Sequence, residues 1–180
     1  MQHLNKMLSD QIKNTIIEIP DFPKPGISFK DITPIFKNPA LGAAIIDEME
    51  KWAEPLVIDV VVGIESRGFM FGYALAQRLG VPFIPIRKAG KLPRAVHKKC
   101  YDLEYGSACL ELQKGDINNG SRVLVHDDLL ATGGTATAAI NLCEMAGASV
   151  VAFHTLVELC FLEARENFSS SIEIKSLASY

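Results

Sequence analysis

The stretch VLVHDDLLATGGT, residues 123–135, decides the fold of this 180-residue chain. Residues 123–125 are apolar and predict a buried strand, and residues 136–145, followed by Gly147, predict a helix. An acid pair and a turn of small residues therefore join a strand to a helix. The small residues at 131–135 allow backbone N–H groups to converge on an anion at the positive end of that helix.

The acid pair, Asp127 and Asp128, predicts a second kind of ligand group at the same turn. Two carboxylates repel an anion and require hydrogen-bond donors, which the vicinal hydroxyls of a ribose supply, as in dinucleotide-binding folds. Hydroxyls at Thr132 and Thr135 would add donors for the anion. A solvated loop beside an ordinary helix start explains each fragment alone, whereas the combination predicts a ribose-5-phosphate site.

The same stretch resembles the phosphoribosyl pyrophosphate (PRPP) signature of type I phosphoribosyltransferases. Four more blocks are similar, in the same order, to the adenine phosphoribosyltransferase family: IPDFPKPGISFKDITPIF (19–36), GIESRGFMFG (63–72), IRKAGKLP (86–93) and DLEYG (102–106). The signature indicates the superfamily, and PGISFKD, GKLP and LEYG narrow it to the adenine enzymes. The resemblance implies purine salvage: PRPP and adenine give AMP and pyrophosphate with Mg²⁺.

The order of apolar runs predicts an α/β fold. Besides the signature, strands are predicted at 58–64, 81–87, 108–112, 149–156 and 172–175, and helices at 4–17, 39–53, 69–79 and 162–168. Repeated strand–helix units predict a mostly parallel twisted sheet flanked by helices on both faces, with ligands beyond the carboxyl ends of its strands. Pro82 and Pro85 indicate that the strand at 81–87 has an edge or irregular portion.

The resemblance implies the type I phosphoribosyltransferase fold, as a single domain over residues 1–180. It implies a small N-terminal hood, with residues 1–36 forming a helix plus the base-binding segment. Residues 88–104 are basic and weakly periodic, and we expect a mobile catalytic loop there that closes over the substrate.

Basic residues after two predicted strands suit a pyrophosphate leaving group. Preorganised cations stabilise the charge that accumulates on its oxygens in the transition state, although a charge run can also be a solvated surface. The resemblance implies that Arg87 reaches the site of a neighbouring subunit in a homodimer. Mg²⁺ would bind mainly through PRPP oxygens near the acid pair, with no direct protein ligand. The implied PRPP- and AMP-binding residues are Arg67, Arg87, Lys88, Lys91, Asp127, Asp128, Ala131, Thr132, Gly133, Gly134 and Thr135.

The base and the proton transfer are assigned by resemblance. Adenine is expected to stack on Phe29, with backbone groups of its neighbours reading the amino edge of the base. Glu104 is expected to accept the imidazole proton of the purine, and Tyr105 to help hold the closed loop. Taken alone, Phe29 fits a core residue and Glu104 an ordinary loop residue. The implied adenine-binding residues are Ser28, Phe29, Lys30 and Leu159.

Composition excludes several classes of partner. The net charge of −3 predicts no general attraction to nucleic acid or anionic membrane. The four cysteines form no CxxC pair, and no segment resembles a signal peptide or a membrane span, so we expect reduced thiols and a cytoplasmic protein. His126 replaces the apolar residue usual in the signature and is expected to be a structural, hydrogen-bonded histidine on the same face as Leu124.

Two other functions fit parts of the pattern. A phosphoribosyltransferase for a 6-oxopurine or another base would differ at few residues. A non-catalytic PRPP-binding regulator would carry a DNA-binding appendage or lack the catalytic loop. The chain has no length for the appendage and keeps Glu104, which favours the enzyme.

Overall fold

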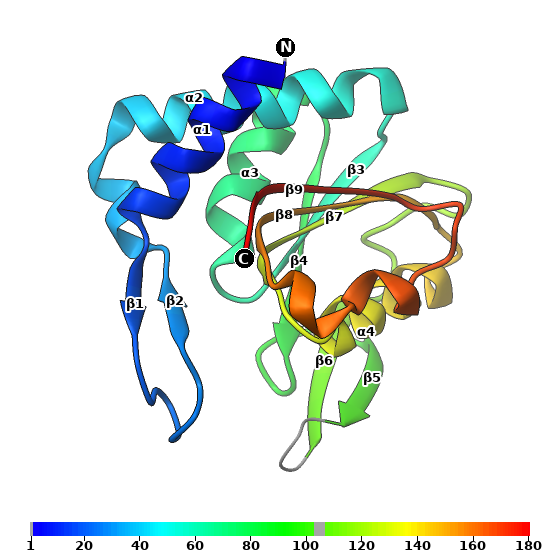
Figure 1. Ribbon diagram of the computed structural model, residues 1–180. Helices are drawn as coiled ribbons and strands as arrows, with labels where there is room; N and C mark the ends of the chain where they lie inside the picture. The colour runs from blue at the N-terminus through cyan, green and yellow to red at the C-terminus, as the bar shows by residue number, and fades with distance from the viewer. Residues whose placement is uncertain (1, 103–106) are drawn as a thin grey trace.

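A computed structural model describes residues 2–102 and 107–180 of the chain (Figure 1). Its main sheet has seven strands in the order β5-β6-β4-β3-β7-β8-β9. From β4 to β9 the neighbouring strands are parallel, whereas β6 is antiparallel to both β4 and β5. The strands are β3 (Val60–Ile64), β4 (Phe83–Lys88), β5 (Val96–Asp102), β6 (Ser107–Gln113), β7 (Arg122–Leu130), β8 (Ser149–Glu158) and β9 (Glu173–Ser179).

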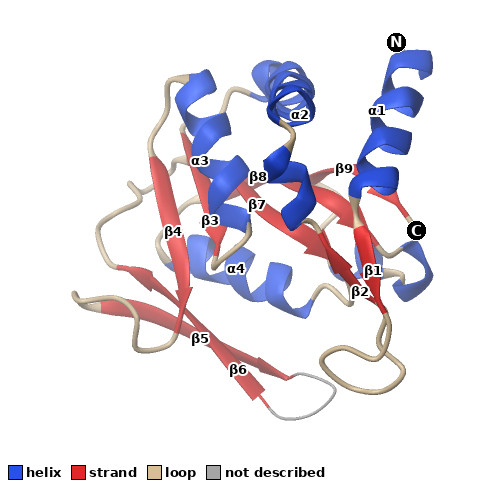
Figure 2. Ribbon diagram, turned by 90° about the vertical axis from the view of Figure 1, so that its left-hand side faces the viewer, coloured by secondary structure: helices blue, strands red, loops and turns tan. Residues whose placement is uncertain are grey.

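Helices cover both faces of this sheet, as predicted (Figure 2). The faces alternate along each strand: Val62 and Val125 pack in the core on the α4 side, and Leu124 in the core on the α1–α3 side. Burial on both faces explains why these strands read as continuous apolar runs. The helices are α1 (Gln2–Thr15), α2 (Pro39–Ala53), α3 (Gly68–Leu79) and α4 (Gly134–Met145), with short 3₁₀ turns η1 (Thr33–Lys37), η2 (Glu54–Leu56), η3 (Cys160–Leu162) and η4 (Ala164–Asn167).

Local capping chemistry sets the predicted boundaries of α2. The Asn38 side chain accepts a hydrogen bond from the Leu41 N–H at 3.1 Å, and Pro39 occupies the first helical position, where it loses no hydrogen bond. The predicted helix at 162–168 is instead the pair of 3₁₀ turns η3 and η4.

Strand β4 lies inside the sheet, but only its last two residues have neighbours on both sides. It pairs with β3 from Phe83 to Ile86, and with β6 only at Arg87 and Lys88. Pro85 therefore lies in the part of β4 that has one paired neighbour, where the missing N–H is tolerated. This one-sided pairing agrees with the edge or irregular portion that the prolines predicted.

A separate antiparallel hairpin, β1 (Ile17–Ile19) and β2 (Phe29–Asp31), follows α1. It projects beside the main sheet and carries the proline-rich segment at its tip (Figure 1). This is the small N-terminal hood that the sequence predicted.

Strand β5 lies inside the segment predicted as a loop. It pairs with β6 from Val96↔Gln113 to Asp102↔Ser107, and α4 packs against it. Its residues show no apolar stripe, because pairing with β6 rather than burial of one face stabilises the strand. Residues 103–106 lie outside the described part of the chain, and the mobility expected of 88–104 stays a prediction.

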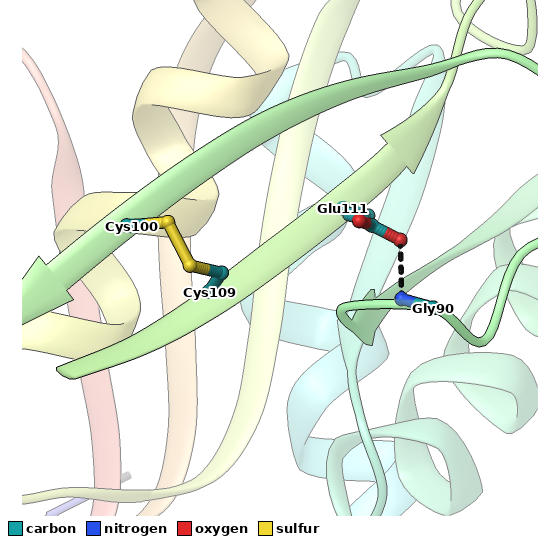
Figure 3. Close-up of a disulfide and its surroundings, with 4 residues drawn as sticks. All are labelled: Gly90, Cys100, Cys109 and Glu111. Carbon is teal, nitrogen blue, oxygen red and sulfur yellow. Dashed lines mark hydrogen bonds between the residues drawn. A yellow bond between two sulfur atoms is a disulfide. The ribbon is translucent and has the colours of Figure 1, made fainter.

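Cys100 and Cys109 form a disulfide between β5 and β6, so the expectation of four reduced thiols is wrong (Figure 3). The two residues are direct partners in the strand register, with Cα atoms 4.0 Å apart. The bridge removes the argument from cysteine usage for a reducing compartment. In the part of the chain that the structure describes, no helix has the length and apolarity needed to cross a membrane.

The disulfide predicts a distinct pattern of thiol labelling. In protein isolated without reductant, a maleimide should label exposed Cys160 and spare buried Cys143, because burial raises the pKa of that thiol to about 12. Denaturation should raise the count to two thiols, and reduction to four, as measured by intact mass. Cys109→Ser should show three thiols on denaturation alone and lose about 2 kcal/mol of unfolding free energy. Four labelled thiols in unreduced, denatured wild type would contradict the bridge.

Candidate active site

The carboxyl ends of the central strands meet at a cavity of about 370 Å³. This is the edge at which parallel α/β sheets bind ligands. Five segments form its wall: the β3–α3 turn, the end of β4, one residue each of β5 and β6, and the end of β7 with its turn into α4. The lining residues are Glu65, Ser66, Arg67, Lys88, Tyr101, Leu110, Asp127, Asp128, Leu129, Leu130, Ala131, Thr132, Gly133, Gly134, Thr135 and Ala136.

The β7–α4 turn has the backbone geometry expected of the predicted anion cradle, residues 131–135. Helix α4 begins at Gly134, two residues earlier than predicted, and Gly133 caps it with a φ of +87° that favours glycine. The Asn167 side chain, at the end of η4, donates a hydrogen bond to the Thr132 carbonyl at 3.1 Å. Since the first N–H groups of an α-helix have no partner within the helix, this turn offers donors and the positive end of a dipole to an anion.

The acid pair lies within β7 rather than in the turn after it, because the strand continues to Leu130. Burial raises the pKa of Asp127 well above its ordinary value, and the neighbouring Asp128 charge raises it further. Burial also raises the pKa of Asp128, against the opposing effect of Arg67, whose Nε lies 3.0 Å from Asp128 Oδ2. Two carboxylates in a partly dehydrated site require donors, which matches the predicted role toward ribose hydroxyls.

Arg67 is placed by a close approach of α3 to β7. A Cβ atom at Gly68 would lie 2.7 Å from the His126 carbonyl oxygen, so only glycine permits this packing. Arg67 Nη1 is buried and has no hydrogen-bond partner among the described residues, which leaves it available to a ligand. The preceding Glu65–Ser66 peptide is cis.

The basic residues at and just after the end of β4 divide into two sets. Lys88 lines the cavity, whereas Arg87 and Lys91 are not among the lining residues. Arg87 Nε and the Lys88 N–H donate to Glu65 Oε2 at 3.1 and 3.0 Å. Burial raises the pKa of Glu65, but these hydrogen bonds outweigh it and the net pKa is lowered. Arg87 also donates to the Lys91 carbonyl at 3.2 Å.

The expected adenine-binding residues lie outside the cavity lining. Phe29, on the hood, is linked to the cavity by Arg67, whose guanidinium carbon lies 4.9 Å from the ring centroid. The Lys30 side chain is buried, forms an ion pair with Glu18 and lies over the Tyr180 ring. A contact of Lys30 with a base would therefore use its backbone, as expected.

Ser28 and Leu159 complete the expected adenine set. The Ser28 hydroxyl donates to Glu18 at 3.3 Å, and the Leu159 N–H donates to the Leu130 carbonyl at 2.9 Å, which places Leu159 beside the carboxyl end of β7. Glu104 and Tyr105 lie outside the described residues, so their roles stay predictions.

His126 agrees with its predicted structural role. It is fully buried, and its Nδ1 lies 3.1 Å from the His154 carbonyl oxygen and 3.2 Å from His154 Nδ1. Burial lowers the pKa of His126 to about 4, so the ring is neutral at pH 7. Its ring faces α3 near Gly72, on the side of the sheet that Leu124 also faces.

Sequence reasoning missed Tyr101. Its hydroxyl accepts a hydrogen bond from the Thr135 hydroxyl at 3.0 Å, at the predicted anion cradle. The residue lay in the segment assigned to a loop, and only the pairing of β5 with β6 reveals its direction. The sequence signal was a tyrosine in a basic stretch, which does not indicate a ligand by itself.

Comparisons with known proteins identify relatives that match nearly the whole length of this chain. The family model for the phosphoribosyl transferase domain matches residues 31–168. An adenine phosphoribosyltransferase from Thermobifida fusca is 46% identical over 175 residues, covering 96% of this chain and 97% of the relative.

Two solved structures are also similar. The Saccharomyces cerevisiae adenine phosphoribosyltransferase, complexed with adenine and D-2,5-dideoxy-2,5-imino-altritol 1,6-bisphosphate, has a TM-score of 0.90 at 41% identity and covers 96% of this chain and 99% of its own. The Trypanosoma brucei adenine phosphoribosyl transferase, in complex with AMP, pyrophosphate and ribose-5-phosphate, has a TM-score of 0.87 at 27% identity and covers 96% of this chain and 79% of its own.

The electrostatics of the acid pair predict that Asp127→Asn stabilises the ligand-free protein at pH 7. The pKa of Asp127 in the folded protein is above the ordinary 3.8. Ionisation of Asp127 therefore lowers stability progressively as the pH rises above 3.8, until the folded-state pKa is passed. Asparagine removes the charge and keeps an acceptor for the Asp128 N–H. We therefore expect Asp127→Asn to have a higher free energy of unfolding than wild type at pH 7.

Urea unfolding at several pH values would measure this gain, which should disappear below about pH 3.8. Asp116→Asn is the matched control, because it breaks an ion pair with Arg94 and should not stabilise the protein. An Asp127→Asn protein that is less stable than wild type at pH 7 would show that the acid pair is not strained by its charge.

Proposed function

This chain belongs to the phosphoribosyl transferase family, and on that premise we propose that it transfers the 5-phosphoribosyl group from PRPP to adenine, giving AMP and pyrophosphate. One observation carries the proposal: the acid pair, the anion cradle and the cations Arg67 and Lys88 line a single cavity. The fold agrees with the predicted type I architecture, at TM-scores near 0.9 to adenine phosphoribosyltransferases.

The cavity suggests how PRPP would bind. The 5-phosphate would lie on the backbone N–H groups of 131–135, and the ribose hydroxyls would donate to Asp127 and Asp128. Arg67 and Lys88 would face the pyrophosphate, and Arg67 Nη1 has the free donor that this requires. Cations preorganised beside the leaving group stabilise the transition state more than the ground state, which supports catalysis.

Mg²⁺ is proposed to enter with PRPP. Among the described side chains, those of residues 6–101 and 107–180, no three His, Cys, Asp or Glu are grouped to hold a metal ion. The acid pair would offer two carboxylates near the ion. These residues fit an ion that is held mainly by phosphate oxygens and water. The bound ion would supply positive charge to the leaving pyrophosphate.

The base would be adenine, held by Phe29 and by backbone groups of Ser28 and Lys30, with Leu159 nearby. Glu104 is proposed to take the proton that leaves the purine, and Tyr105 to hold the closed segment 88–104. Relatives named adenine phosphoribosyltransferase match over nearly their full length, and the yeast relative is complexed with adenine, which favours this base over a 6-oxopurine. The same full-length match favours an enzyme over a PRPP-binding regulator.

An assay with four bases tests the function. Wild type with PRPP and Mg²⁺ should form nucleotide and pyrophosphate from adenine, and far more slowly from hypoxanthine, guanine and uracil. Glu104→Gln should lower the single-turnover rate with adenine by at least about 100-fold, the lower bound for a general base, while PRPP affinity is retained. The two quantities separate loss of basicity from loss of positioning.

Glu173→Gln is the matched control, since Glu173 is exposed on β9 away from the cavity. Faster turnover of hypoxanthine or guanine than adenine would establish the 6-oxopurine alternative. A Glu104→Gln rate within about threefold of wild type would show that another group accepts the proton.

We also propose a homodimer, through the apolar groove between η1, α2 and α3. Phe36 and Met70 line this groove and are 39% and 43% exposed. Apolar side chains gathered in one exposed groove favour a partner surface. Arg87, which is not part of the cavity lining, would then reach the pyrophosphate of the partner site, as the resemblance implies.

Met70→Glu should convert the dimer to a monomer, because a charge in the groove would be desolvated on association. Sedimentation equilibrium would measure the mass. Met145→Glu is the matched control, since Met145 is 50% exposed on α4, on the opposite face of the sheet. Dimeric Met70→Glu, or monomeric wild type, would exclude this interface.

A further inference from the structure

Tyr101 of β5 reaches the anion cradle, although it precedes the signature by more than twenty residues in sequence. Its hydroxyl lies 3.0 Å from Thr135 Oγ1, and both residues line the same cavity. Thr135 stands in the first turn of α4, where an anion would meet the helix. A phenol hydroxyl is therefore positioned beside the N–H groups proposed to bind the 5-phosphate.

The hydrogen bond leaves a donor unused. Thr135 donates its hydroxyl proton to Tyr101, so the phenol keeps its own proton. Among the described backbone groups and the side chains of residues 6–101 and 107–180, no acceptor for that proton is found. A polar hydrogen of this kind at a cavity wall requires a partner, and an anion bound at residues 131–135 has the chemistry to accept it.

The tyrosine is also held in place from two sides. Its ring packs against the core formed with α4, and its backbone pairs with Ala108 of β6. The adjacent register pair is the Cys100–Cys109 disulfide, which joins β5 covalently to β6 (Figure 3). A hydroxyl on a ring with few rotamers, next to a covalent cross-link, loses little conformational entropy when it binds a ligand.

We propose that Tyr101 is a further ligand of the 5-phosphate, with its hydroxyl donating to a phosphate oxygen held by the 131–135 turn. The inference rests on the proposed function, because it needs a phosphate in this cradle. The Thr135 hydroxyl then bridges Tyr101 and the helix terminus, so that a strand from outside the signature completes the anion site. A neutral phenol supplies this donor without adding charge beside Asp127 and Asp128.

Calorimetric titration of Tyr101→Phe with ribose 5-phosphate, AMP and adenosine tests the proposal. The variant keeps the ring and removes only the hydroxyl. Ribose 5-phosphate and AMP should bind at least about tenfold more weakly than to wild type, as expected for a hydrogen bond to a charged group. Adenosine, which lacks the phosphate, should bind equally to both proteins.

Tyr73→Phe is the matched control, because Tyr73 is 55% exposed on α3 and outside the cavity. Ribose 5-phosphate affinity within twofold of wild type, or an equal loss for adenosine and AMP, would overturn the role of Tyr101 alone. Wild type that does not bind ribose 5-phosphate would overturn the proposed function together with this inference. Because binding is measured without turnover, the two failures are distinguishable.

Discussion

The whole site depends on holding two adjacent carboxylates at the buried end of a central strand. Burial and mutual repulsion raise the pKa of Asp127, and burial raises that of Asp128. The only cation in contact with the pair among the described ion pairs is Arg67, which belongs to the loop after the neighbouring strand. Such a pair is costly in the empty protein and becomes favourable when a ligand supplies donors or positive charge.

The order of the sheet brings those compensating groups together. Strands β3 and β7 are parallel neighbours, so the loop that carries Arg67 and the turn that carries the cradle leave the same edge side by side. Gly68 allows α3 to start against β7, and a larger residue there would push Arg67 away from Asp128. The ionic geometry therefore follows from close packing of backbone, which explains why glycine is required at a position that binds nothing itself.

The sequence predicted the features that are determined by residues close together in the chain. The caps of α2, the buried strands, and the strand–turn–helix signature depend on residues that are near one another in the chain, and the structure confirms them. The extension of β7 through Asp128, the antiparallel β5–β6 pair and the Cys100–Cys109 bridge depend on pairing between segments. The basic residues of β5 show no strand pattern in the sequence, because contacts with β6 and α4 stabilise this strand.

The same distinction separates the site residues that sequence identified from the one that it missed. One short segment contains Asp127, Asp128 and the small residues that follow them, so the sequence pattern alone indicates their chemistry. Tyr101 meets Thr135 only because β6 runs back along β4 and aligns β5 over the start of α4. Residues that complete an anion site from a second segment carry no motif, and finding them requires the hydrogen-bond partners of the cradle to be traced outward through the fold.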